Sequence, residues 1–216
     1  MKKVIMFLDS PLQSWGGESV SYSYRTTENR PTFSAIIGIL CSCIGISFRK
    51  DNEKVKELRD NIKINVISLQ KGSLLKEFQS CGTNIKAKDK KDWFNKDRES
   101  GKIYTKEYLQ DAKFIAILQI SDCLDVDMII KALKSPKWMP FFGRFCCMPA
   151  TPILVENLDY FKKYLSDRQY FKGKMYQHVE NIDAEYMVMD YPNCDGTNGF
   201  SARGIKESMV EISKYF

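Results

Sequence analysis

The sequence contains little of what acid–base catalysis usually needs. His178 is the single histidine among 216 residues, and histidine is the side chain that most often acts as general acid or base. One histidine without a C-x-x-C motif also argues against a structural zinc site. The acidic residues of the segment 122–127 fit a helix start better than a metal cluster. Gly16-Gly17 lacks the lysine and serine of a phosphate-binding loop. We therefore predict no catalytic residue, no metal and no cofactor.

Long apolar runs and a disulfide framework are missing too. No apolar run approaches the ~20 residues of a membrane span, and the first one, Val4–Leu8, stops at Asp9 without the pattern of a secretory signal. The seven cysteines are odd in number and scattered, which is typical of reduced, mostly buried thiols. We expect a cytoplasmic protein with no membrane partner.

The composition predicts one folded domain. Hydrophobic residues make up 44% of the chain and charged residues 28%, which suffices for a real core and argues against wholesale disorder. The net charge of +6 is compatible with nucleic acid without being specific for it.

The order of the expected elements predicts an α+β fold. A buried strand at Val4–Leu8 precedes a long loop and a helix that Thr32 or Ser34 caps and Gly45 ends. A strand from Ile62, with a bulge near Ile67, is followed by a turn and by Leu74–Gln79 as its return strand. Further helices are expected to begin at 51 or 52, at 125 and near 158, and further strands at 114–120, 186–189 and 209–212. This order is that of a ferredoxin-like fold, which RNA-recognition domains share with many unrelated proteins.

Three segments carry a resemblance to a known family. They are Ser10–Gly16 (SPLQSWG), Arg25–Ser34 with its Arg-Thr-Thr and Arg-Pro-Thr-Phe-Ser motifs, and Pro136–Arg144 (PKWMPFFGR). Tyr108–Ala112 and Gly199–Arg203 match more weakly. In this order the segments resemble the Cas-five family of CRISPR-associated proteins, with a spacing most similar to the CasD-type members of its type I-E branch.

The resemblance implies a fold and a function. The fold would be a single RAMP-like domain (ferredoxin-like, similar to the RNA-recognition motif) over 1–216, with a basic thumb hairpin inserted at 80–106 and a C-terminal elaboration at 153–216. The function would be to bind the 5′ handle of a guide RNA (crRNA) in a Cascade surveillance complex of antiviral defence. The partners would be a CasC-type backbone subunit and a CasA-type large subunit, with target DNA reached indirectly. The alternatives are a guide-processing endoribonuclease of the type I-C kind and a general single-stranded RNA-binding module.

The first matching segment offers groups suited to splayed RNA. Gln13 and Ser14 supply hydrogen-bonding groups at the end of a strand, and Trp15 supplies a flat face for a base. Trp15 could equally fill the top of the core.

The other two segments offer phosphate ligands. Arg25, Thr26 and Arg30 precede the first helix, whose N-terminal amides favour anions, and Gly143 would form a tight turn that presents Arg144. Solvated arginines or a local pair of Arg144 with a carboxylate are the structural alternatives.

A basic run lies within the expected thumb. Residues 86–106 hold eight basic and four acidic side chains, an excess of four, with Lys86 and Lys88 among the basic ones. A charge run of this kind is most often a solvated face. The resemblance instead implies that Lys86 and Lys88 contact the guide.

Overall fold

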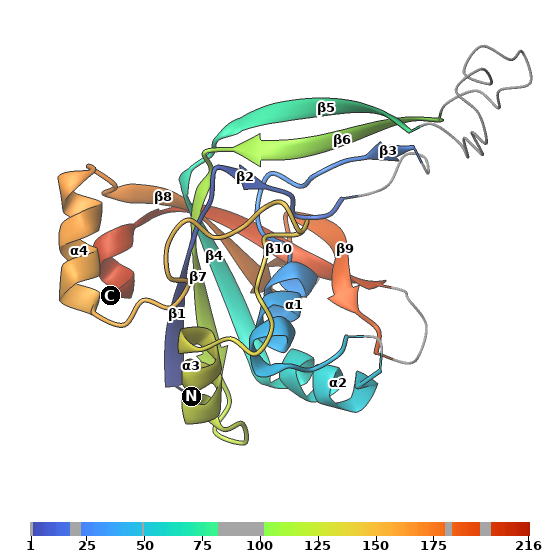
Figure 1. The fold of residues 1–216 in the computed structure, drawn as a ribbon. Coiled ribbons are helices and arrows are strands. Elements are labelled where there is room, and N and C mark those ends of the chain that lie inside the picture. Colours follow the sequence, from blue (N-terminus) through green and yellow to red (C-terminus); the bar gives the residue numbers. More distant parts are fainter. Residues whose placement is uncertain (1, 18–22, 49, 82–101, 180–182, 195–199) are drawn as a thin grey trace, which may run out of the picture.

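The protein is described from a computed structural model that covers residues 2–17, 23–48, 50–81, 102–179, 183–194 and 200–216 (Figure 1). Its largest element is a six-stranded sheet with helices on both faces (Figure 1). In spatial order its strands are β1 (Lys2–Asp9), β7 (Lys113–Ile120), β4 (Ile62–Gln70), β8 (Lys172–Val179), β10 (Phe200–Glu211) and β9 (Tyr186–Pro192). All five of these pairings are antiparallel.

A second, four-stranded sheet rises from one end of the first (Figure 1). It consists of β2 (Leu12–Gln13), β6 (Lys102–Gln110), β3 (Tyr24–Arg25) and β5 (Ser73–Cys81). The long strands β5 and β6 pair antiparallel over their whole length, while β3 adds to β6 in parallel.

Both faces of the large sheet are covered, which explains the unbroken apolar runs of β1 and β7. On one face Phe114, Ala116 and Leu118 pack against α1 (Phe33–Ile44), α2 (Asn52–Asn61) and α3 (Val126–Lys134). On the other face Ile115 and Ile117 pack against α4 (Leu158–Asp167) and the short 3-10 helix η3 (Ile212–Tyr215). Among the described helices none is long and apolar enough to cross a membrane.

The predicted helix ends are confirmed at their caps. The Thr32 side chain accepts a hydrogen bond from the Ala35 amide at the start of α1, and Gly45 ends that helix with a left-handed φ of 86°. Asp125 accepts from the Met128 amide and caps α3. The expected bulge also exists, as a register irregularity between Ser68 and Gln70.

One strand pairing was predicted wrongly, and one strand of the large sheet was not predicted. The strand predicted at 74–79 exists, but it pairs with β6 and not with β4. Gly72 turns the chain out of the large sheet with φ 70°, where an added Cβ would lie 2.4 Å from the Gln110 carbonyl oxygen. The strand without a prediction is β8, because its polar and glycine-containing sequence hides its burial. Gly173 lies so close to β4 that a Cβ would come within 2.6 Å of the Ile67 side chain.

The two segments expected as additions are built into the sheets. β8 pairs with β4, so the chain after residue 153 extends the large sheet. Residues 102–106, at the end of the expected thumb, belong to β6. Lys86 and Lys88, also expected in the thumb, lie outside the described residues.

Candidate nucleic-acid interface

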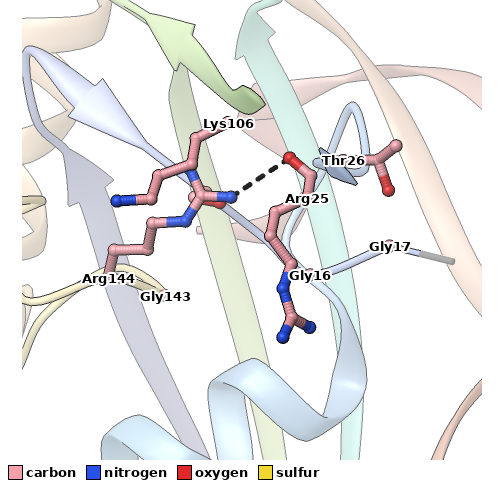
Figure 2. Close-up of a pocket in the computed structure, with 8 residues that line it drawn as sticks. Gly16, Gly17, Arg25, Thr26, Lys106, Gly143 and Arg144 are labelled. Carbon is pink, nitrogen blue, oxygen red and sulfur yellow. Dashed lines mark hydrogen bonds between the residues drawn. The ribbon is translucent and has the colours of Figure 1, made fainter. Parts of the chain in front are cut away.

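A basic pocket lies where the small sheet meets the loops that follow β2 and α3 (Figure 2). It has a volume of about 390 Å³, and none of the eight described residues that line it is acidic. Three cationic side chains line it, Arg25, Lys106 and Arg144, together with Ser14, Gly16, Gly17, Thr26 and Gly143. Segments far apart in the sequence thus meet at one site, which we call the cation pocket.

A close backbone contact fixes one wall of the cation pocket. The Ser14 amide donates a 2.9 Å hydrogen bond to the Phe142 carbonyl oxygen, which joins the two loops. Gly143 has φ 91°, and an added Cβ would lie 1.4 Å from the Ser14 carbonyl oxygen. Only glycine fits this position without a shift of the backbone, so Gly143 sets the place of the next residue, Arg144.

Arg144 is held by backbone and by an aromatic ring. Its guanidinium donates to the carbonyl oxygens of Glu107 (2.8 Å) and Arg25 (3.2 Å; Figure 2) and lies 4.5 Å from the centre of the Tyr108 ring. None of these contacts is with a carboxylate, so they do not show the alternative of a local pair between Arg144 and a carboxylate. Carbonyl oxygens leave the positive charge of Arg144 unneutralised, and a guanidinium carries more donors than these two bonds use. Arg144 can therefore still bind an anion.

Lys106 and Arg25 add two further charges from neighbouring strands. They face each other in the parallel register of β3 and β6. The Lys106 ammonium donates to the Gln79 amide oxygen at 2.5 Å, and that oxygen carries no net charge. Three cations that line one pocket repel one another, and an anion in the pocket would relieve the repulsion.

The carboxylate of Glu107, beneath the pocket, already has hydrogen-bonding and ionic partners. Glu107 accepts from the Tyr24 hydroxyl at 2.6 Å and lies 3.5 Å from the Lys76 ammonium. The hydrogen bond from Tyr24, followed by those from the Thr27 amide and Lys76, lowers the pKa of Glu107, so it remains ionised at neutral pH. Glu107 orders β3 and the loop after it and thereby fixes the backbone of Arg25.

A larger groove adjoins the cation pocket and shares Gly16, Gly17 and Thr26 with it. Its volume is about 740 Å³. The walls combine hydroxyl groups of the 26–34 loop with exposed apolar side chains of β9 and β10, among them Met187, Met189 and Phe200. Three acidic residues, Glu28, Glu107 and Asp190, also line the groove. Such a groove offers both apolar contact and hydrogen bonds.

The comparisons with known proteins identify the family. The family described as CRISPR-associated protein (Cas_Cas5) matches residues 4–210. The chain belongs to the Cas-five family. The resemblance seen in the sequence is therefore confirmed.

A curated relative and two solved structures show how far the similarity extends. The CRISPR system Cascade subunit CasD of Escherichia coli (strain K12) is 26% identical over 160 residues, which cover 70% of this chain and 69% of the relative. A chain of a structure titled "CRISPR RNA-guided surveillance complex" superposes with a TM-score of 0.72 at 19% identity over 98% of this chain and 91% of its own. A second, titled "Crystal structure of Cas protein", gives 0.67 at 22% identity over 99% and 97%. The fold, a mixed α/β arrangement with antiparallel sheets, is shared with these structures.

The polar residues of the first family segment are internal. The Gln13 side chain donates to the Leu8 and Ala112 carbonyl oxygens and accepts from the Trp15 indole at 2.9 Å. Trp15 is fully buried between Phe114 and Phe142, so the expectation that its face stacks on a base does not fit this structure. The alternative, a tryptophan that fills the core, is the observed arrangement.

Arg30 also differs from its expected setting as a phosphate ligand. Its guanidinium is buried and lies 4.8 Å from the Tyr176 ring centre and 5.5 Å from that of Tyr186. It lines the adjoining groove and not the cation pocket. The predicted set therefore divides, and Ser14, Arg25, Thr26, Gly143 and Arg144 are the members that the structure brings together.

Two contributors were missed as site residues, Lys106 and Tyr108. Both lie on the same face of β6, two residues apart, so the alternation of a strand was the signal that could have found them. His178 lies exposed on β8, and its pKa is lowered by partial desolvation and by the charge of Arg203. Within the described part of the chain its side chain has no hydrogen-bonding partner, and no group of three or more His, Cys, Asp or Glu side chains could hold a metal ion.

Proposed function

We propose that this Cas-five protein binds the 5′ handle of a crRNA as a non-catalytic subunit of a Cascade-type surveillance complex. The observation that carries the proposal is the convergence of Arg25, Lys106 and Arg144 on one pocket without an acidic lining residue. The Cascade subunit and the surveillance-complex chain among its relatives support this assignment. Sequence choice in the target would be left to base pairing of the guide.

The cation pocket is suited to a phosphate of the RNA backbone. Phosphate accepts several charged hydrogen bonds at once, and arginine presents its donors in a planar fork that matches the phosphate oxygens. The glycines at 16, 17 and 143 let the ligand approach the backbone closely. Arg25, Lys106 and Arg144 thus fix the path of the handle, as phosphate contacts generally position a nucleic acid.

The adjoining groove is suited to the next nucleotide. Its hydroxyl groups can bond base edges or a ribose 2′-hydroxyl, while Met187, Met189 and Phe200 offer apolar contact to a base. Because the groove and the cation pocket share Thr26, one nucleotide step can span both.

Two exposed apolar surfaces support a place in an assembly. The first follows α3 and includes Phe145, which is 75% exposed, and its neighbours Trp138, Met139, Phe141 and Met148. The second is one face of the β5–β6 hairpin, where Leu74, Phe78 and Ile103 are exposed. Apolar patches of this kind mark protein interfaces. We propose that they contact the CasC-type backbone and CasA-type large subunits.

The fold supports a finer classification. We interpret the strand order β1-β7-β4, with α1 and α3 packed on one face, as a variant of the ferredoxin-like (RAMP) fold. The β5–β6 hairpin would then form the base of the inserted thumb.

The test is RNA binding by single-site variants. Arg25→Ala and Arg144→Ala should each weaken binding of repeat-derived RNA about tenfold, the value of one charged hydrogen bond. The slope of log affinity against log salt should fall by about 0.7 for each lost phosphate contact. Lys54→Ala is the matched control, because Lys54 is an exposed cation on α2, away from the pocket.

Two results would contradict the proposal. One is an unchanged affinity and salt slope for both arginine variants when thermal melts show them folded. The other is the absence of a uniform repeat-derived sequence at the 5′ end of the RNA that co-purifies with the assembled complex.

A further inference from the structure

Two adjacent cysteines lie in the turn that carries Arg144. The sulfur atoms of Cys146 and Cys147 are 3.9 Å apart. Cys146 is exposed to solvent, whereas Cys147 is fully buried in the main core. Cys123, an exposed thiol elsewhere, instead bonds Asn61 and Ser121.

The pair is connected directly to the cation pocket. The Cys147 amide donates to the Arg144 carbonyl oxygen at 2.8 Å, and the Phe142 amide donates to the Cys147 carbonyl oxygen at 2.7 Å. These two bonds close the turn around Gly143 and Arg144. The Cys146 thiol also contacts the Tyr108 hydroxyl at 3.9 Å, and the Tyr108 ring supports the Arg144 guanidinium. A change at the sulfurs would therefore reach Arg144 through both the backbone and the ring.

We propose that Cys146 and Cys147 form a redox modification site, which a peroxide oxidises to a disulfide between the two neighbours, and that this disulfide displaces Arg144 from the cation pocket. The inference that RNA binding then weakens rests on the proposed function, whereas formation of the disulfide does not.

The chemistry is balanced in two steps. The Cys146 thiolate attacks one oxygen of hydrogen peroxide, the O–O bond breaks, and the products are a sulfenic acid and, after protonation, water. The Cys147 sulfur then attacks the Cys146 sulfur, an S–S bond forms, the S–O bond breaks, and the second oxygen leaves as water with the thiol proton. The two sulfurs together lose two electrons to the peroxide. Exposure assigns the first step to Cys146, and the 3.9 Å contact places the Cys147 sulfur next to the sulfenic acid that it attacks.

The disulfide must distort the turn. A disulfide bond measures about 2.05 Å, so the sulfurs must approach by about 1.9 Å from their separation of 3.9 Å. The two residues are neighbours in the chain, so their backbone must twist to allow this approach. This twist weakens the hydrogen bonds of the Phe142 and Cys147 amides, which close the turn.

The experiment compares the reduced and peroxide-treated 216-residue chain by three measurements. Peptide mass should show the loss of two hydrogen atoms on the peptide that contains both cysteines, and a maleimide added after unfolding should label two fewer thiols. Amide hydrogen exchange at Phe142 and Cys147 should become faster in the oxidised chain. Affinity for repeat-derived RNA should fall about tenfold, as for loss of one charged hydrogen bond, and recover with a thiol reductant.

Variants separate the possible outcomes. Cys146→Ser and Cys147→Ser should abolish all three changes, and Cys123→Ser should keep them. Should peroxide stop at a sulfinic acid on Cys146, or leave the mass and the amide exchange unchanged, the inference is overturned. Oxidised and reduced chains of equal RNA affinity would overturn the coupling to Arg144. If the reduced chain binds no RNA at all, the proposed function fails, and the mass and exchange measurements still decide the redox site.

Discussion

The buried ion pair between Arg203 and Asp190 anchors the start of α1, and its removal should be strongly destabilising. Two hydrogen bonds of 2.9 and 2.8 Å join the guanidinium to the two carboxylate oxygens, and the side chains are only 7% and 6% exposed. Asp190 also accepts from the Phe33 amide at 2.8 Å, and the Arg203 guanidinium lies 4.9 Å from the Phe33 ring centre. The pair thus connects β9 and β10 to the first residue of α1.

The expected loss follows from this burial. Asp190→Asn keeps the shape of the side chain but leaves the Arg203 charge buried without its counter-ion, for which we expect a loss of about 3–5 kcal/mol in the free energy of unfolding. Arg203→Met should lower the free energy of unfolding by about as much, because it leaves the Asp190 carboxylate buried without its counter-ion. The double variant should lose much less than the sum of the two, since no unpaired charge remains.

Urea unfolding at neutral pH is the assay, with stability taken from the midpoint at constant slope. The control is Glu156→Gln, which breaks the exposed pair of Lys134 and Glu156 and should change stability by less than about 1 kcal/mol. A loss below about 1 kcal/mol for Asp190→Asn, or strict additivity in the double variant, would refute the reasoning.

Three further predictions concern the site. Gly143→Ala should displace Arg144 and lower RNA affinity at least as much as Arg144→Ala, whereas Gly38→Ala, with nothing within 4 Å of its added Cβ, should be tolerated; equal RNA affinity of both variants and the wild type would contradict the close contact with Ser14. Trp15→Ala should lower the free energy of unfolding by about 3–5 kcal/mol, measured by thermal melts, and an unchanged stability with weaker RNA binding would show instead that the ring faces RNA. His178→Ala should leave RNA binding unchanged, and repeat RNA should stay intact with the wild-type chain; cleavage at one position, lost in the variant, would overturn the non-catalytic assignment.

Much of the helical structure could be predicted because its signals are local. Thr32, Gly45 and Asp125 act within one helical turn of their own positions, so residue type alone indicates the boundary. Strand pairing depends instead on distant partners. The alternation of β5 predicted a strand correctly, but only the position of β6, far along the chain, determines which sheet it joins.

The site residues show the same division. The sequence motifs located Arg25 and Arg144 because they lie inside family segments, and the structure places both on one pocket. Burial of Gln13, Trp15 and Arg30 could not be predicted, because a polar or amphipathic side chain near a strand end can face solvent or close on the core. Lys106 was predicted as one charge of a solvated or RNA-binding run, and only its parallel register with Arg25 assigns it to the pocket.

The family segments contribute to the site mainly through backbone geometry. Gly16 has φ 59° and Gly143 has φ 91°, conformations that other residues rarely adopt. The Gln13 side-chain amide fixes the start of the loop after β2 by bonding two backbone carbonyl oxygens and the Trp15 indole. Because these contacts are internal, their loss would move the cation pocket without removing a charge. Substitutions at Gln13 should therefore reduce RNA affinity and leave the salt slope higher than substitutions at Arg25 and Arg144 do.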